Sequence, residues 1–302
     1  MQSKQANLDK KTSDTKIDLK TIEWNKYMVY IVFVIVFLAF SIFLGNKGFL
    51  SSNNLFNILR QTSMISIMAV AGTFVLAAGQ IDLTVGAVAA MTAMCVSLVL
   101  QSTNSIILAL LTGLGFGVIC GAVNGFLVTI LKIPAFLATL GMMQIIRGSA
   151  MWITNTAAVP IKNNQFNSVF GIGSVGGISV LILWTILFYV VGVFLFNKTP
   201  FGKHTLATGG NELSAKYSGI NTNLIKLKVF IMSGAFAAFA GILYAGRMQS
   251  GRYSFGDGDE MSVIAAVVLG GAAMNGGSGS VIGALVGSLL MGIIKNALIL
   301  AG

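Results

Sequence analysis

Long apolar runs separated by short polar stretches make up most of the 302-residue chain. The run at 27–44 carries no charge over eighteen residues. At about 1.5 Å per helical residue, it just crosses a hydrocarbon core of about 30 Å. Runs of similar character predict further membrane-spanning helices at 62–78, 85–100, 106–131, 134–153, 178–196 and 229–246. Before the second of these, SSNN (51–54) offers helix caps, and LFNIL (55–59) is expected to lie in the membrane interface.

Two more apolar runs, 261–273 and 281–294, are shorter. Runs of about 10–14 residues are more often re-entrant or broken helices than complete spans. The pattern also allows the second run to extend through Lys295 and Asn296 to Leu300. The sequence therefore predicts an all-α, polytopic transmembrane helical bundle of about nine membrane segments, some of them broken or re-entrant.

Composition narrows the class of protein further. Hydrophobic residues make up 55% of the chain and charged residues only 9%, whereas a soluble domain carries about 25% charged residues. This argues against a soluble enzyme and against a nucleic-acid-binding protein. The 36 glycines against 3 prolines suit helices that approach closely, or that break where they line a cavity.

The distribution of charge predicts the orientation. Residues 1–26 hold six lysines against four acids and no apolar core of signal-peptide length, and 197–228 holds five lysines against one acid. The positive-inside rule therefore places a retained N-terminal tail and 197–228 in the cytoplasm, with 155–177 and 247–260 outside. We expect a tail (1–26) and a transmembrane domain (27–302), with the C-terminus outside after an odd number of crossings.

No catalytic motif is present in the sequence. It holds no GxxxxGK[ST] phosphate loop, no HExxH and no GxSxG, and His204 is its single histidine. Cys95 and Cys120 lie inside apolar runs and are expected to be small core residues. We therefore expect a protein that is not an enzyme and needs no cofactor or metal, so that any ATP must be bound by another chain.

The first candidate site is AAGQIDLTVG (77–86), which places Gln80, Asp82 and Thr84 between two apolar runs. A carboxylate at the middle of a bilayer costs about 2.5–3.5 kcal/mol on insertion scales, so it normally faces a cavity or pairs with a cation. Two interpretations stay open. Asp82 lines a translocation path, or it only caps the helix that follows.

The second candidate site is the glycine-rich stretch 256–287, in which two short apolar runs flank GGAAMNGGSGS (270–280). Two half-helices that meet at a glycine break suit a substrate path, although a tight hairpin packed through small residues is the alternative. We favour the path, with candidate residues Gly270, Gly271, Asn275, Gly276 and Gly277.

A charged residue interrupts the segment at 134–153. Pro134 suits the first turn of a helix and Lys132 marks the cytoplasmic edge. Arg147 then lies roughly 20 Å further along the helix. We expect it to reach the outer interface by snorkelling rather than to pair with a buried acid.

The last candidate is a short helix within the basic loop, at 207–221. Asn211 is a good N-cap, Glu212 suits the positive helix start and Gly219 offers a stop. Leu213 and Tyr217 then share one face, one turn apart. We expect a docking element on the cytoplasmic side, made of Asn211, Glu212, Leu213, Lys216, Tyr217 and Gly219, although an ordinary amphipathic loop helix would show the same pattern.

These segments carry a resemblance to the membrane subunits of bacterial sugar ABC importers, most closely the ribose permeases. The matching residues are NNLFNILRQTS (53–63), GQIDLTVGA (79–87), IPAFLATLGMM (133–143), FGKHTLATGGNELSAKYSGIN (201–221) and IAAVVLGGAAMNGGSGSVIGALVGSLLMG (264–292). The resemblance implies a second permease copy (a homodimer or a related heterodimer), an ATPase subunit that docks on 201–221 and an extracytoplasmic sugar-binding protein. Family members continue beyond NALILAG (296–302) with a tenth hydrophobic helix, so this chain is expected to lack a final C-terminal helix.

Two classes of function remain at this stage. The first is the translocation subunit of an ATP-driven importer of a monosaccharide, with ribose as the expected sugar. The alternative is a secondary transporter of a small polar solute that uses Asp82 and a proton or sodium ion. The capped cytoplasmic helix favours the first, because a secondary transporter has no ATPase to dock.

Overall fold

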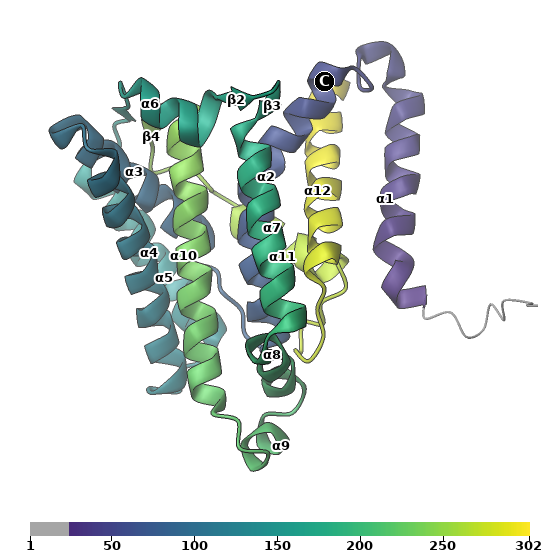
Figure 1. The fold of residues 1–302 in the computed structure, drawn as a ribbon, viewed down its shortest axis with the longest axis vertical. Coiled ribbons are helices and arrows are strands. Elements are labelled where there is room, and N and C mark those ends of the chain that lie inside the picture. The colour runs from purple at the N-terminus through teal and green to yellow at the C-terminus, as the bar shows by residue number, and fades with distance from the viewer. Residues whose placement is uncertain (1–23) are drawn as a thin grey trace, which may run out of the picture.

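The computed structural model describes residues 24–302, which form a bundle of long helices (Figure 1). The expected N-terminal tail lies almost entirely outside the described residues. Eight of the described helices are long and apolar enough to cross a membrane. They are α1 (Trp24–Phe43), α2 (Ser52–Ala77), α3 (Val85–Thr103), α4 (Ile106–Thr129), α5 (Ala135–Ile153), α7 (Val180–Lys198), α10 (Thr222–Met248) and α12 (Val281–Ala301). The chain is an all-helical, multi-pass membrane protein.

Shorter elements join these helices. They are the 3₁₀ helix Gly45–Lys47, α6 (Asn164–Asn167), the π-helix Ser168–Ile172, α8 (Pro200–Gly210), α9 (Glu212–Tyr217), α11 (Asp259–Leu269), β1 (Val159–Pro160), β2 (Ser174–Val175), β3 (Ile178–Ser179) and β4 (Ser250–Gly251). The strands form two antiparallel pairs, β1 with β4 and β2 with β3. The β1–β4 pair ties the loop after α5 to the loop after α10.

In the described part of the chain, the nine expected membrane segments are present as eight helices long enough to span and one shorter element, the eighth in chain order. It is α11, whose eleven residues rise only about 16 Å, half of a hydrocarbon core. The run that begins at 281 does extend past Lys295 and Asn296, and α12 reaches Ala301. The expectation of one broken or re-entrant element is therefore confirmed for α11.

Two helices begin earlier than the apolar pattern suggests. The Oγ of Ser51 accepts a hydrogen bond from the Asn54 N–H, and α2 continues from Ser52 without a break. Residues 55–59 are part of α2, and the Asn54 side chain just before them pairs with Asn296 of α12 at 3.0 Å; their place in the membrane interface stays a prediction. In the same way α10 begins at Thr222, capped by Asn221, and projects several residues beyond its apolar part.

The centre of the bundle is formed by α2, α3 and α10, whose side chains are mostly buried, whereas α1 has few buried side chains and packs along one face only. Small residues let the inner helices approach. A Cβ atom on Gly117 of α4 would collide with the backbone of Gly234 on α10. Such backbone contact between helices is what the glycine content predicted.

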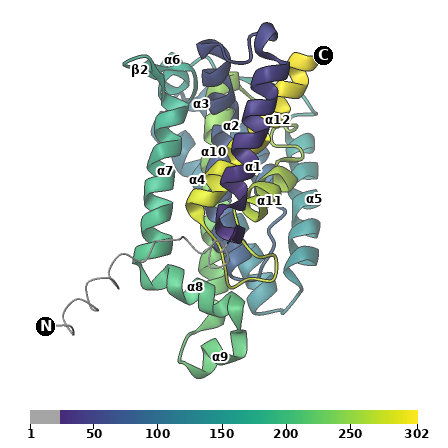
Figure 2. The same cartoon turned by 90° about the vertical axis from the view of Figure 1, so that its right-hand side faces the viewer.

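The loops gather at two opposite ends of the bundle (Figures 1 and 2). Helices α8 and α9 lie at one end, which we call the α9 end. The strand pairs and α6 lie at the other, the strand end, together with Gly302 (Figure 1). Residues 197–228 and 155–177 therefore lie at opposite ends, as expected from the charge distribution. Which end faces the cytoplasm is a separate question, taken up below.

Candidate functional site

An irregular segment leads from the end of α2 deep into the bundle. Residues 78–84 follow Ala77 and end where α3 begins at Val85. The Oδ1 of Asp82 accepts hydrogen bonds from the N–H of Thr84 at 2.9 Å and from its Oγ1 at 2.6 Å. The Oδ2 accepts one from the Ser233 hydroxyl of α10 at 2.7 Å. Ser233 lies roughly 16 Å along α10 from its first residue, within the apolar part of that helix, so Asp82 is held inside the helix bundle.

The same segment is bound by two further helices. Asn124 of α4 donates to the Thr84 hydroxyl at 3.0 Å, and Thr139 of α5 donates to the Ile81 carbonyl at 3.3 Å. Beside Asp82 lies a cavity of about 10 Å³, bounded by side chains of α2, α10 and α11, which is room for about one water molecule. Asp82 thus holds Thr84, the N-cap residue of α3, and also borders a small cavity. Both interpretations left open by the sequence stay predictions.

We expect Asp82→Asn to impair transport more than assembly. Asparagine has nearly the same shape and can keep an acceptor toward Thr84, but it removes the charge, and that loss makes membrane insertion easier. Uptake into cells and the amount of inserted protein should be measured together. Asp82→Ala is the matched comparison. It leaves buried donors unpaired, at about 1–3 kcal/mol each, and should lower the yield as well. Normal uptake by the asparagine variant would show that the charge serves only as a cap.

A second irregular segment enters from the strand end. Residues 249–258 follow α10 and lead to α11. At its start Gly251 packs on Ala93 in α3, and further down Gly256 packs on Gly86, in the first turn of α3. The sequence expectation of an external loop at 247–260 is therefore wrong for its second half, which lies deep against α3.

Arg147 of α5 holds this segment. Its Nη1 donates to the carbonyls of Tyr253 at 2.6 Å and Phe255 at 2.9 Å, and its Nη2 donates to that of Gly256 at 3.4 Å. The side chain is only 15% exposed. The expectation that Arg147 snorkels to the interface is wrong, because the descending backbone brings buried acceptors to the guanidinium instead.

Two acids that the sequence analysis did not select begin α11 at this depth. Asp259 accepts a hydrogen bond from the Tyr244 hydroxyl at 2.5 Å. Glu260 is buried, and its Oε2 has no hydrogen-bond partner among the described residues. That oxygen lies 2.7 Å from where a Cβ on Gly86 would be. The signal in the sequence was a pair of acids directly after Gly258 and before an apolar run, which indicates a helix start as well as a loop.

The glycine break 270–280 lies at the α9 end, away from Asp82. The N–H of Gly277 donates to the Ala77 carbonyl at 2.9 Å. A Cβ on Gly276 would lie 2.7 Å from the Gly209 carbonyl and 2.8 Å from Gly79. Gly277 faces Gly210 equally closely. We call these five residues, Gly79, Gly209, Gly210, Gly276 and Gly277, the glycine junction.

The structure therefore separates the candidate path residues. Asp82 and Thr84 lie inside the bundle, against Ser233 and Asn124. Gln80 and Asn275 lie by the glycine junction, since Gln80 donates to the Gly79 carbonyl at 2.9 Å and the Asn275 carbonyl approaches Gly79. Gly270 packs on Gly283 of α12. Gly271 has no atom within 4 Å of its Cβ position and follows directly after the end of α11. Its φ of +96° explains the glycine.

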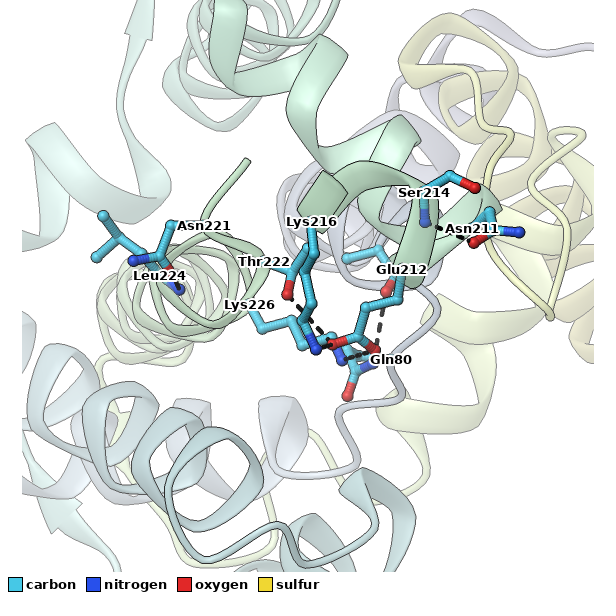
Figure 3. A network of polar contacts seen from close by, with 10 residues as sticks. Gln80, Asn211, Glu212, Ser214, Lys216, Asn221, Thr222, Leu224 and Lys226 are labelled. Atoms are coloured by element: carbon cyan, nitrogen blue, oxygen red, sulfur yellow. Dashed lines mark hydrogen bonds and ion pairs between the residues drawn. The ribbon is translucent and has the colours of Figure 1, made fainter. Parts of the chain in front are cut away.

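The short helix α9 (Glu212–Tyr217) has the caps that the sequence predicts. The Asn211 side chain accepts from the Ser214 N–H at 2.9 Å, and Gly219 follows the helix with a φ of +84°. Figure 3 shows the Glu212 carboxylate in a network with Lys216 (2.8 Å), Lys226 (2.7 Å) and Thr222 (3.2 Å). Because Lys226 and Thr222 belong to α10, Glu212 braces α9 against that long helix.

The ion pairs of Glu212 with Lys216 and Lys226 persist at acidic pH. Hydrogen bonds from Lys216 and Lys226 lower the pKa of the Glu212 carboxyl to about 2. A lowered pKa means that the stabilisation is complete above the ordinary value of about 4.3 and is lost only as the pH falls toward 2. On this braced helix Leu213 and Tyr217 point outward, with 66% and 91% of their surfaces exposed.

Among residues 24–302 no group of three or more His, Cys, Asp or Glu side chains is placed to hold a metal ion. Cys95 and Cys120 are free thiols, the second of them buried.

Comparisons with known proteins agree with this architecture. The family described as "Branched-chain amino acid transport system / permease component" matches residues 54–302. The probable ABC transporter permease protein YphD of Escherichia coli (strain K12) is 38% identical, over 92% of this chain and 83% of its own length. The ribose import permease protein RbsC of the same strain is 38% identical, over 85% and 81%. The L-arabinose ABC transporter permease protein AraH of Azospirillum brasilense is 37% identical, over 91% and 80%. No solved structure matches significantly.

Proposed function

Because the chain belongs to the family of permease components matched by its residues 54–302, we propose that it is the translocation subunit of an ATP-driven monosaccharide importer, with ribose as its sugar. As an ABC permease component, it is not itself an enzyme. One observation supports the ATP-driven mechanism best. A capped, ion-paired helix carries two exposed anchors, Leu213 and Tyr217, at the end of the bundle where the broken elements meet.

The proposed partners follow from the two ends of the bundle. An ATPase subunit docks on α9 in the cytoplasm, and an extracytoplasmic sugar-binding protein docks at the strand end. A second permease copy completes the pore. Helix α8 connects the ATPase contact to the path, since Gly209 and Gly210 at its end touch Gly79, Gly276 and Gly277. A push on α9 thus reaches both the segment before α3 and the segment before α12.

The choice of ribose rests on relatives. Several of them are named ribose import permeases, and others L-arabinose permeases, so the shared substrate class is a pentose. The ion-coupled secondary transporter loses support, because the chain belongs to a family of permease components and presents a docking helix that such a transporter does not need.

Reconstitution tests the proposal. The chain, co-purified with its ATPase subunit and binding protein, should import radiolabelled ribose into liposomes only with ATP on the α9 side. L-arabinose in place of ribose tests the specificity. Uptake driven by a proton or sodium gradient without the ATPase would instead establish the secondary transporter.

We expect the protein to lie in a bacterial inner membrane with its α9 end facing the cytoplasm. Five lysines against one acid at 197–228 support this orientation. On a background free of Cys95 and Cys120, an impermeant thiol reagent added to intact cells should label Lys162→Cys, an exposed residue of the strand end, and spare Lys216→Cys. The reverse pattern would invert the topology.

A further inference from the structure

Arg147 makes an unusual set of contacts for a membrane arginine. Its guanidinium bonds three backbone carbonyls, at residues 253, 255 and 256, all in the segment 249–258. In the described part of the chain, the carbonyls of Tyr253 and Phe255 accept hydrogen bonds from Arg147 alone. The added ion pair with Asp257 spans 3.7 Å to a carboxylate that is 81% exposed, and such a pair contributes little. The carbonyl contacts are therefore what fixes the side chain.

The segment that Arg147 binds covers one face of α3. Gly251 packs on Ala93 and Gly256 packs on Gly86. These α3 residues are seven apart, so they lie on one helix face, and Ala90 lies between them. Ala90 is fully buried. Underneath the lower end of the segment lies the Glu260 carboxylate, whose Oε2 has no partner among the described residues.

Arg147 also connects two parts of the bundle. Its own helix, α5, packs on α3 and α4, whereas α11, which continues the bound segment, packs on α2 and α12. The segment lies on α3 next to α5 but leads directly into α11, which also contacts α3, so a movement of α11 relative to α5 would strain the guanidinium contacts.

We propose that Arg147 is a positioning residue that holds segment 249–258 closed over the start of α3, so that the strand-end side of the path is sealed at mid-depth. Release of the three carbonyls lifts the segment and exposes the α3 face together with Glu260, a free acceptor for a hydroxyl-bearing solute. The proposal rests on the proposed function, because a closed segment is a gate only in a protein that conducts a solute.

The test measures accessibility and needs no transport. Ala90→Cys is introduced on a background without Cys95 and Cys120, and the detergent-solubilised protein is treated with a bulky polar maleimide. Arg147→Gln should speed labelling of residue 90 by about tenfold or more, since hydrogen bonds from a charged donor are the stronger kind. Arg147→Lys, which keeps a point charge but has no planar fork, should give an intermediate rate.

A matched probe separates a gate from general loosening. Ser288 is fully buried between α12 and α2, where its hydroxyl meets that of Ser66 at 2.7 Å. Labelling of Ser288→Cys should stay slow in both Arg147 variants. Unchanged labelling at residue 90, or an equal rise at 90 and 288, would overturn the proposal. If the glutamine variant does not fold, the lysine variant decides by the same comparison. Failure of ribose import by the wild-type complex would count against the proposed function and would leave the labelling result intact.

Discussion

Leucine at Gly277 should abolish transport and lower the yield of folded protein. The residue has a φ of +78°, and a Cβ there would lie 2.7 Å from the Cα of Gly210. A left-handed backbone costs a non-glycine residue roughly 1–2 kcal/mol, and overpacking adds about 1–3 kcal/mol. Since native proteins are stable by only about 5–15 kcal/mol, the two costs together remove a large part of the free energy of unfolding. Thermal unfolding of the purified protein and sugar uptake in cells both report the effect.

Gly271→Leu is the matched control. Its φ of +96° imposes the backbone cost, but nothing lies within 4 Å of its Cβ position, so the overpacking part is absent. It should therefore be the milder of the two variants in both measurements. Equal effects at 271 and 277 would mean that backbone conformation alone explains the glycines and that the contact with α8 has no role.

The glycine junction matters because it joins three chain segments without any intervening side chain. Gly209 and Gly210 end α8, Gly79 begins the segment that leads to Asp82, and Gly276 and Gly277 belong to the break before α12. Where two backbones are in direct contact, a displacement of one is passed to the other almost in full, because packed protein interiors have low compressibility. In the proposed mechanism, a contact at α9 would therefore displace both the segment before α3 and the break before α12.

Local signals in the sequence predicted local structure well. Asn211 and Gly219 predicted both ends of α9. The apolar runs predicted seven of the eight spanning helices, although the observed helices begin or end at somewhat different residues. The late start expected for α2 arose because polar residues at 52–54 lower the hydropathy. Of these residues Asn54 alone is half-buried, and its side chain pairs with that of Asn296, 242 residues away.

Long-range contacts account for what the sequence could not show. The pattern around Arg247–Glu260 is that of a charged external loop, and nothing local tells that its carbonyls meet Arg147, more than 100 residues earlier. The same holds for Asp82, whose partner Ser233 is 151 residues away. Glycine content predicted close packing but not its place, since Gly271 and Gly277 look alike in sequence and differ only in what surrounds them.

The largest functional effect is expected at α9. Replacing Leu213 and Tyr217 together by alanine should give a permease that is made and inserted but neither retains the ATPase nor transports sugar. Buried anchors at an interface commonly cost about 2 kcal/mol or more on truncation, roughly thirtyfold in affinity. With 66% and 91% of their surfaces exposed, the two side chains contribute little to the isolated fold. Co-purification of the ATPase and ATP-dependent uptake are the measurements.

Two variants make this result specific. Leu224 of α10 is also exposed at this end, at 44%, and Leu224→Ala should leave the ATPase bound, because it lies outside the docking helix. Glu212→Ala removes the brace to Lys226 and Thr222 while keeping both anchors. This variant should therefore still bind the ATPase, but ATP hydrolysis should be coupled less well to transport, so that less sugar is moved for each ATP hydrolysed. Normal transport by the 213/217 double variant would remove the docking role of α9 and return the ion-coupled transporter to consideration.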